Sequence, residues 1–266
     1  MRDLQVDWSN LDAIHIHGGI WRSQLYYYLL RRRMPHAAWV VHLHGSEARS
    51  GKGLHHLGLA DALLCSTPDL RRFVPRCEWL PNPVPLPSEV PQLARGGQIT
   101  IGHFPSDRRM KGTDLILNVL EDQFGPPRTE THESMSVTRY SWATFDFLIA
   151  ERISHDEVLA RIEECDAVID HLSELGPVSL VALEAMARSR AALSSYDAAA
   201  YPADCPVIRL VPETAGSTVR EVLDDAERIR TAGTSGRRYV EAHHQPEKVA
   251  ATSIRTYEAI QRWHGR

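Results

Sequence analysis

Short apolar runs alternate along the chain with longer stretches that repeat apolar residues at helical spacing. In the first 90 residues this pattern predicts strands over 13–17, 38–44, 61–66 and 78–81, and helices over 21–33 and 68–74. From residue 97 onward it predicts strands over 99–104, 144–149, 166–172, 191–196 and 206–211, and helices over 113–124, 154–165, 180–189 and 236–263. Strands separated by helices of this length indicate parallel sheets built from βαβ units.

A proline-rich segment, Asn82 to Gly97, separates the two series and is typical of an interdomain linker. We therefore predict two α/β domains, a reduced one over residues 1–90 and a second one over residues 91–266. By a family resemblance described below, the last helix of the chain is expected to cross back to the first domain.

Composition narrows the class of protein. The 266 residues are 43% hydrophobic and 24% charged, and the formal net charge of −4 gives no indication of nucleic-acid binding. The four cysteines are widely spaced and form no Cys-x-x-Cys, which argues against a zinc knuckle or disulfide framework and favours a reducing cytosol. No apolar run reaches the roughly 18 residues that span a bilayer, and the N-terminus lacks a signal-peptide core. A cytoplasmic protein is predicted.

Two predicted strands end in paired histidines, His15 with His17 and His42 with His44, and each pair shares one strand face. Four imidazoles could ligate a metal, but this needs a further ligand, for which Glu47 is the obvious candidate. Alternatively, one histidine of each pair is packed and hydrogen-bonded inside the sheet. We favour a third interpretation, because ligands of open α/β sheets bind at the carboxyl ends of strands.

Under that interpretation, His17-Gly18-Gly19 and His44-Gly45 mark two strand ends at which glycine lets a ligand approach the backbone. His44 is then a ligand-facing residue, whereas His15 and His42 are structural. No metal site is expected.

Two later segments are candidates for binding phosphate. In the first, residues 102–114, Arg108, Arg109 and Lys111 crowd a predicted loop that follows a strand and opens a helix. A solvated basic turn explains the same residues. The glycine motifs of P-loop and dinucleotide-binding proteins are both missing from the loop, which argues against an NAD-type oxidoreductase.

In the second segment, residues 174–187, a Gly-Pro turn precedes a helix, and Pro177 suits the first helical turn. The backbone N–H groups of residues 178–180 would then be free to hold a phosphate or sugar oxygen. Glu184 follows on the apolar helix, where an unpaired carboxylate is costly to bury, so that binding of ribose hydroxyls would give it a role. A glutamate with a structural partner is the alternative.

With these segments, the chain resembles the family-4 glycosyltransferases of the GT-B fold. "KGTDLILNVL" is similar to their Lys-Gly helix start, "LEAMA" to their donor-site block, "LPNPV" to the crossing between their domains, and "VVHLHGSEAR" to their acceptor-side strand. The resemblance covers nearly the whole chain from residue 12. It implies an α/β fold of two Rossmann-like parallel-sheet domains facing a cleft, with the N-terminal domain reduced.

The resemblance also implies a reaction and a set of roles. The enzyme would move a sugar from a nucleotide-diphosphate sugar to an acceptor with retention, with no bound metal and no cofactor. His44 would lie beside the transferred sugar, and Arg108 and Lys111 would neutralise the donor diphosphate. The donor-binding residues would be Gly176, Pro177, Val178, Ser179 and Glu184. The acceptor and the oligomeric state are not predicted.

The sequence departs from the family in one important position. The family has two glutamates separated by seven residues, and Gly176 stands where the first belongs, with Glu174 two residues earlier. A non-catalytic GT-B-like protein that binds a nucleotide or a partner is therefore the alternative function. The segment Leu25 to Arg33, "LYYYLLRRR", combines aromatic and basic residues, which permits at most peripheral membrane contact, although helix packing is favoured.

Overall fold

The computed structural model describes residues 11–18, 24–90, 97–173 and 176–265 of the chain. The chain divides into two compact units: unit 1, residues 1–83 with 246–266, and unit 2, residues 84–245. The division thus falls at Pro83, within the proline-rich segment and seven residues before the expected boundary at residue 90. Gly19, Glu174 and residues 91–96 of the expected linker lie outside the described residues.

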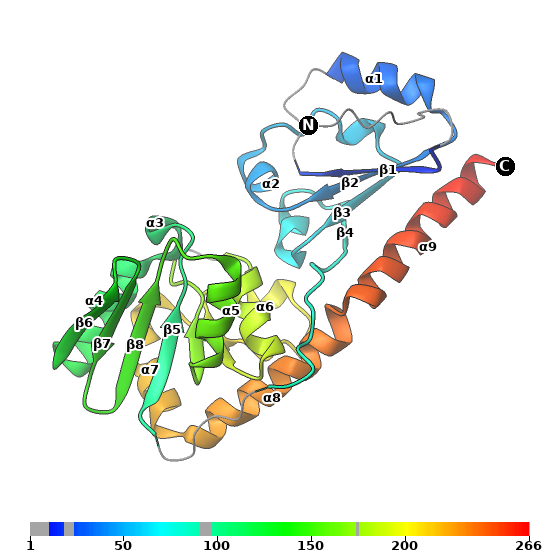
Figure 1. The fold of residues 1–266 in the computed structure, drawn as a ribbon. Helices are drawn as coiled ribbons and strands as arrows, with labels where there is room; N and C mark the ends of the chain where they lie inside the picture. Colours follow the sequence, from blue (N-terminus) through cyan, green and yellow to red (C-terminus); the bar gives the residue numbers. More distant parts are fainter. Residues whose placement is uncertain (1–10, 19–23, 91–96, 174–175, 266) are drawn as a thin grey trace. The chain divides into compact units, whose positions relative to one another are not determined.

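Unit 1 is built on a parallel sheet with the strand order β1-β2-β3-β4 (Figure 1). Its strands are β1 (Ala13–His17), β2 (Ala38–Leu43), β3 (Ala62–Cys65) and β4 (Glu78–Trp79). Its helices are α1 (Gln24–Arg33), α2 (Ser46–Ser50) and α9 (Pro246–His264), with 3₁₀ turns at Leu57–Leu59 and Pro68–Arg72. All six residues of β2 are buried, which explains its continuous apolar sequence.

The two faces of this sheet are covered differently. Val249 and Ile260 of α9 pack with Val40 and Leu64 on one face. Leu30 of α1 packs in a second cluster with Trp39 and Met34. Because side chains alternate along a strand, Trp39 lies on the face opposite to Val40, so this cluster covers the other face of the sheet. The side chains of His15 and His17 on β1 and of His42 on β2 alternate with the residues of this second cluster. They therefore lie on the face that α9 covers.

The C-terminal helix predicted over 236–263 is two helices. Helix α8 (Ala226–His243) ends in unit 2, and α9 begins at Pro246 in unit 1. Proline has no N–H to continue the helical hydrogen bonds and disfavours helical geometry in the residue before it. The prediction of a single helix was therefore wrong at this proline.

Unit 2 contains a sheet with the strand order β11-β10-β9-β5-β8-β7-β6. The strands are β5 (Ile99–His103), β6 (Thr129–Ser134), β7 (Val137–Ser141), β8 (Phe145–Ala150), β9 (Ala167–Ile169), β10 (Ala191–Ser194) and β11 (Ile208–Arg209). The helices are α3 (Arg108–Lys111), α4 (Thr113–Phe124), α5 (His155–Glu163), α6 (Leu180–Ala187), α7 (Ala215–Asp224) and α8, with 3₁₀ turns at Ala198–Ala200 and Pro212–Thr214.

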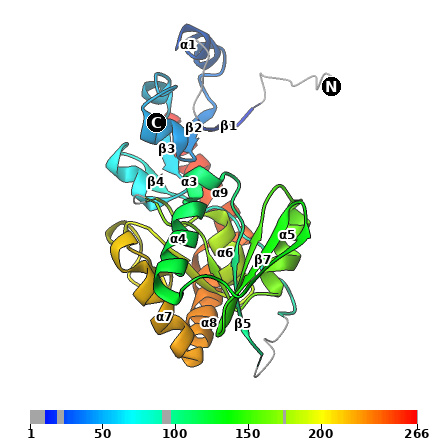
Figure 2. The ribbon, with the colours of Figure 1, turned by 90° about the vertical axis from the view of Figure 1, so that its left-hand side faces the viewer.

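Helices cover both faces of the unit 2 sheet (Figures 1 and 2). Ile116 of α4 and Val219 of α7 share a core with Phe147 of β8, whereas Ile162 of α5 and Ala185 of α6 pack on the other face. The strands from β11 to β8 are mutually parallel, as predicted. Strands β6 and β7 form an antiparallel hairpin at the edge that the sequence did not predict. All residues of β6 are exposed, so its sequence lacks the apolar alternation that reveals a strand.

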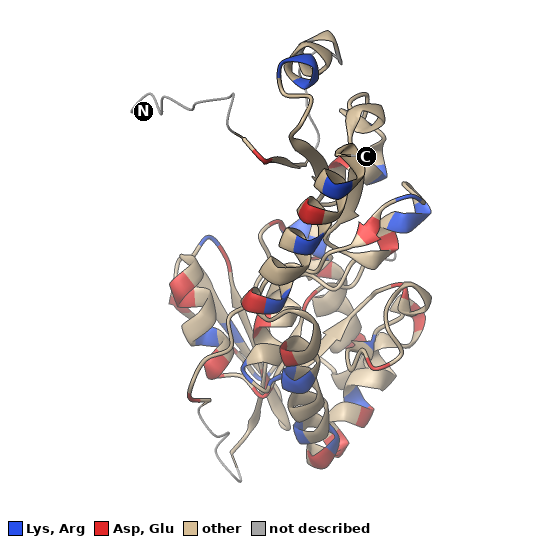
Figure 3. Cartoon of the chain, turned by 90° about the vertical axis from the view of Figure 1, so that its right-hand side faces the viewer, with Lys and Arg blue, Asp and Glu red and all other residues tan. Residues whose placement is uncertain are grey.

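Within the described residues, no helix is long and apolar enough to cross a membrane. Acidic and basic residues both occur along α8 and α9, as Figure 3 shows, in agreement with the modest net charge.

Candidate functional site

The position of Lys111 in unit 2 is fixed by the glycine that follows it. Residues Arg108–Lys111, predicted as a loop, form the short helix α3 after β5, and Asp107 caps it by accepting a hydrogen bond from the Met110 N–H at 2.8 Å. Gly112 has φ +68°, and a Cβ there would overlap the carbonyl oxygen of Leu172. The Leu172 N–H in turn donates to the Lys111 carbonyl at 3.1 Å. The Lys-Gly pair therefore fixes α3 against the segment that follows β9.

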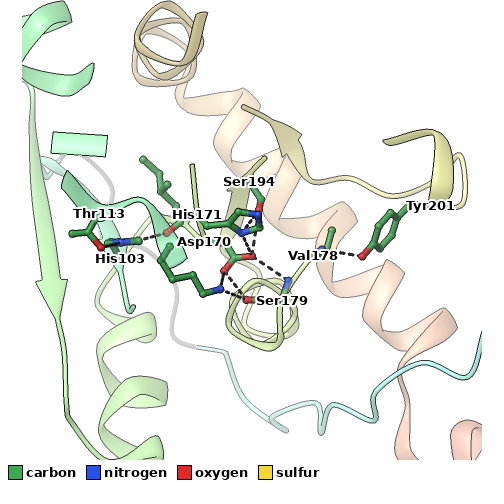
Figure 4. Close-up of polar contacts among 10 residues, drawn as sticks. His103, Thr113, Asp170, His171, Val178, Ser179, Ser194 and Tyr201 are labelled. Carbon is green, nitrogen blue, oxygen red and sulfur yellow. Dashed lines mark hydrogen bonds and ion pairs between the residues drawn. The ribbon is translucent and has the colours of Figure 1, made fainter. Parts of the chain in front are cut away.

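Lys111 joins the two segments that the sequence singled out. Its Nζ lies 2.6 Å from Asp170 Oδ1 and 3.0 Å from Ser179 Oγ (Figure 4). Asp170 directly follows β9, and its side chain is fully buried. Burial alone would raise the pKa of Asp170, but the Lys111 ammonium and a hydrogen bond from His171 hold this pKa well below its ordinary value. The carboxylate therefore stays ionised and fixes the ammonium beside Ser179.

Further side chains complete a buried polar network around Asp170. His171 Nδ1 lies 3.1 Å from Asp170 Oδ2, and Ser194 Oγ at the end of β10 donates to the same oxygen at 3.2 Å. A Cβ on Gly176 would lie 2.6 Å from His171 Nε2. Because His171 is 4% exposed and cannot easily move aside, it occupies the space that a side chain at position 176 would need.

The turn from Gly176 to Ser179 differs from the sequence prediction in its hydrogen bonding. The Val178 N–H donates to the Tyr201 hydroxyl at 2.9 Å, and the Ser179 N–H donates to Asp170 Oδ2 at 3.1 Å. Two of the three N–H groups expected to be free are therefore engaged within the protein. The prediction overlooked that nearby side chains satisfy backbone donors at a buried helix start. Pro177 is half-buried and lies in the turn that precedes α6.

Glu184 lies on α6, as predicted, and is 6% exposed. Its Oε1 lies 2.7 Å from Nε2 of His155, the first residue of α5. The His155 side chain is 63% exposed, so this pair lies at the solvent edge of unit 2. The His155 pair gives Glu184 the structural partner of the alternative interpretation. Because His155 is exposed, the same pair also leaves the carboxylate near solvent, as ribose binding requires.

Arg108 is not part of the Lys111 network. Its guanidinium pairs with Asp114 at 2.9 Å and with Glu151 at 2.7 Å, and the side chain is 42% exposed. Burial opposes the charged form, but the two carboxylates raise the pKa of Arg108. Arg109 is exposed on the same helix. Of the three basic residues predicted to bind phosphate, only Lys111 contacts the segment that follows β9 in the described structure.

His103 ends β5 and is fully buried. Its Nδ1–H donates to the Ile169 carbonyl at 2.8 Å, and in the neutral ring Nε2 accepts from the Thr113 hydroxyl at 2.9 Å (Figure 4). Burial lowers the pKa of His103 to about 4, so the ring is neutral near pH 7. This histidine ties β5, β9 and the start of α4 together.

In unit 1, His44 belongs to a group of four imidazoles on the face that α9 covers. His44 Nε2 lies 2.9 Å from His17 Nδ1, and the His17 ring stacks on that of His15 with centroids 4.4 Å apart. The His42 ring lies 4.5 Å from that of His44. The histidines that the sequence divided into ligand-facing and structural residues therefore form one continuous cluster.

Burial and mutual proximity favour the neutral form of His15, His42 and His44. Burial, followed by repulsion from neighbouring histidines, lowers the pKa of His15 to about 4 and that of His42 to about 3, and the pKa of His44 is also lowered. Glu47 Oε1 accepts the His44 backbone N–H at 2.5 Å, and among the described residues the group with metal-ligand spacing contains His15, His17 and His42 but not Glu47.

The basic end of α1 is partly engaged in packing. Arg31 forms a two-point ion pair with Asp61, with distances of 2.6 and 2.8 Å, and lies over the Trp39 ring. Leu25 and Leu29 are exposed on the same helix. Helix packing therefore accounts for Arg31, and peripheral membrane contact remains a prediction for the rest of the segment.

Sequence reasoning missed Asp170, His171, Ser194 and His155. Asp170 and Ser194 stand at the carboxyl ends of β9 and β10, the edge at which ligands of α/β sheets bind. The strand predicted over 166–172 extends past Asp170, whereas β9 ends at Ile169, so the sequence did not show that Asp170 lies at the strand end. His155 gave no signal, because its partner Glu184 is 29 residues away.

Comparison with known proteins supports the fold. No family model matches the sequence, and no curated protein matches it. Among solved structures, sucrose-phosphate synthase from Thermosynechococcus elongatus has a TM-score of 0.67 at 16% identity, over 94% of this chain and 73% of that one. HepE from Anabaena in complex with UDP-glucose has a TM-score of 0.64 at 13% identity, over 93% and 79%. A glycosyltransferase from Rickettsia africae has a TM-score of 0.63 at 10% identity, over 94% and 77%.

These structures are GT-B glycosyltransferases, and the likeness at such low identity shows the fold alone. The predicted fold class, with Rossmann-like α/β domains built on parallel strands, is confirmed. The chain is shorter than each of the three structures that it matches.

Proposed function

We propose that the chain is a glycosyltransferase that moves a sugar from a nucleotide-diphosphate sugar to an acceptor, with retention and without a bound metal. One observation carries the proposal. The Lys-Gly helix start and the turn before "LEAMA", 68 residues apart, meet through the contact of 3.0 Å between Lys111 Nζ and Ser179 Oγ. They meet beyond the carboxyl ends of β5 and β9, where α/β sheets bind ligands. The glycosyltransferase fold of the similar structures supports the same assignment.

In this proposal, Lys111 neutralises charge on the leaving diphosphate. Asp170 keeps the ammonium oriented, and Ser179 offers a hydroxyl beside it. A fixed cation in a partly buried site stabilises developing negative charge without having to reorganise. Arg108 contributes a second positive charge from the same short helix, after exchanging a carboxylate partner for a phosphate oxygen.

Glu184 is proposed to bind the ribose of the donor. A carboxylate can accept two hydrogen bonds from vicinal hydroxyls, and the Glu184 carboxylate is held at one oxygen by the exposed His155. The turn Gly176, Pro177, Val178 and Ser179 would then face the diphosphate and the sugar through its side chains and the start of α6 rather than through the two occupied N–H groups.

Uridine is the first base to test. HepE and an alpha-glucosyltransferase were both solved with UDP, and TarM was solved with UDP in a complex that also contains a glycosylated glycerol. By the same family resemblance, His44 would act beside the transferred sugar. From the cysteine usage, the protein would work in the cytosol. The four cysteines, none of which forms a disulfide, agree with a reducing compartment.

The test measures nucleotide release from a panel of nucleotide-diphosphate sugars in the presence of varied acceptors. Wild type is compared with Glu184→Gln and with a control, Glu157→Gln, which neutralises an exposed carboxylate on α5. Loss of a hydrogen bond to a charged group is worth about 1.5–3 kcal/mol, so we expect Glu184→Gln to lower kcat/KM for the donor by about ten- to a hundredfold. The control should retain the wild-type value.

A second candidate function is a non-catalytic protein that binds a nucleotide or a partner. Gly176 favours it, because this position lacks the first family glutamate and His171 fills the adjacent space. Nucleotide binding that depends on Lys111, with no turnover of any donor, would support this candidate over the enzyme.

A further inference from the structure

We propose that unit 1 binds a divalent zinc ion through His15, His17 and His42, here called the histidine triad. Among the described residues, these three histidines form a group whose candidate ligand atoms all lie within 4.8 Å of one another. The proposal does not depend on the Lys111 network of unit 2. It does involve the neighbour of His44, the residue that the proposed function places beside the sugar, because His17 contacts His44.

The backbone geometry holds the triad in register. His15 and His17 are two residues apart on β1, and His17 lies directly opposite His42 on β2. Three nitrogens at roughly 2.0–2.1 Å from a tetrahedral ion lie about 3.3 Å apart, so the rings must close by roughly 1.5 Å at most. Because the His15 and His17 rings are stacked with an angle of 14° between their planes, ion binding also requires the rings to turn so that their lone pairs converge.

Three ring nitrogens of the triad are buried without a hydrogen-bond partner. His42 is 4% exposed, and neither of its ring nitrogens makes a hydrogen bond of ordinary geometry, although the Leu80 backbone lies close to the ring. Nε2 of His15 is also buried without a partner. Buried polar atoms in folded proteins are nearly always hydrogen-bonded, so several unpartnered imidazole nitrogens in one cluster point to a ligand that binds them.

The Nδ1 atoms of His15 and His17 each have a hydrogen-bonding neighbour, as the non-ligating nitrogens of metal-bound histidines usually do. His15 Nδ1 lies 2.5 Å from the Tyr257 hydroxyl, and His17 Nδ1 lies 2.9 Å from His44 Nε2. If each Nδ1–H donates to its neighbour, the lone pair of each Nε2 is free for an ion. Such outer hydrogen bonds fix the tautomer and orientation of ligating histidines.

Zinc is the ion that suits this donor set. Three imidazoles and one open position make a common tetrahedral zinc site, whereas calcium and magnesium require oxygen ligands. His17 is exposed, so a water molecule can reach the fourth position, and the neighbouring His44 offers an alternative. A bound ion would also join β1 to β2 and raise the free energy of unfolding of unit 1.

The experiment titrates the full chain, with its purification tag removed and metal stripped by a chelator, with Co²⁺ and then with Zn²⁺. Tetrahedral Co²⁺ reports its ligands by its visible absorption, and Zn²⁺ affinity is obtained by competition with a chromophoric chelator. We expect one equivalent to bind. His17→Ala changes an exposed residue and should preserve the fold, yet it should weaken binding at least tenfold, as should His42→Gln.

Tyr257→Phe removes only the outer hydroxyl and should weaken binding by about tenfold. His36→Ala, which removes an exposed histidine of the same unit, is the control and should bind like wild type. Absence of a tetrahedral Co²⁺ spectrum in wild type, or an affinity that is unchanged in His17→Ala and His42→Gln, would overturn the proposal.

Discussion

Asp170 illustrates what single residues contribute to unit 2. A fully buried carboxylate is costly unless it is paired, and here it receives an ammonium, two hydroxyls, a backbone N–H and an imidazole. The sequence shows an aspartate after a strand, but it does not show that Lys111, 59 residues earlier, reaches it. Lys111, Ser179 and Glu184 could therefore be named as candidates from the sequence, whereas Asp170, the partner that orients Lys111, required the fold.

Gly176 gives a prediction at the same scale. Gly176→Ala places a methyl group against the His171 ring, which is held by hydrogen bonds, and we expect a loss of about 1–3 kcal/mol in the free energy of unfolding. Gly97→Ala is the matched control in unit 2, because a Cβ there meets nothing within 4 Å. Denaturant unfolding measures both variants. Equal stability of the two variants would show that the His171 ring moves aside without cost and would contradict the prediction.

At the scale of elements, the sequence predicted those helices and strands that bury one apolar face against the core. The helix predicted over 113–124 is α4, residue for residue, because its apolar face packs on the sheet and Gly112 and Gly125 bound it. The β6–β7 hairpin was missed because an exposed edge needs no apolar alternation. Its pairing partner, not its own sequence, defines it as a strand.

The junction between α3 and α4 gives the second prediction. Gly112→Ala combines a left-handed backbone with an overlap against the Leu172 carbonyl, so we expect a loss of more than about 2 kcal/mol. Gly51→Ala has the same φ of +68° with open space at the Cβ and should cost only about 1 kcal/mol. Thermal unfolding compares the two. A similar loss in both variants would show that the contact between Gly112 and the Leu172 carbonyl does not require glycine.

At the scale of the whole molecule, buried neutral histidines couple stability to pH. The pKa of His103 is lowered to about 4, and those of His15 and His42 are lowered to about 4 and about 3. Between pH 6.5 and 4, the unfolded chain binds protons that the folded chain excludes, so stability is complete above pH 6.5 and is lost as the pH falls. Each such group contributes up to about 1.4 kcal/mol per pH unit within this window.

Calorimetry in buffers of different ionisation enthalpy tests this coupling in the metal-free chain. At pH 5.5 unfolding should take up protons, and at pH 8 the histidine contribution should vanish. Proton release at pH 5.5 would contradict the neutral state of the buried rings.

The donor site is the central claim, and binding of UDP tests it most directly. Calorimetric titration would compare wild type with Lys111→Ala and with Arg109→Ala, which removes the same charge from an exposed position of the same short helix. A charge-assisted contact to phosphate is worth about 1.5–3 kcal/mol, so Lys111→Ala should weaken binding by about ten- to a hundredfold while Arg109→Ala stays near wild type. Equal affinities of the two variants, or no binding of UDP, GDP, ADP or dTDP to wild type, would contradict a donor site at Lys111.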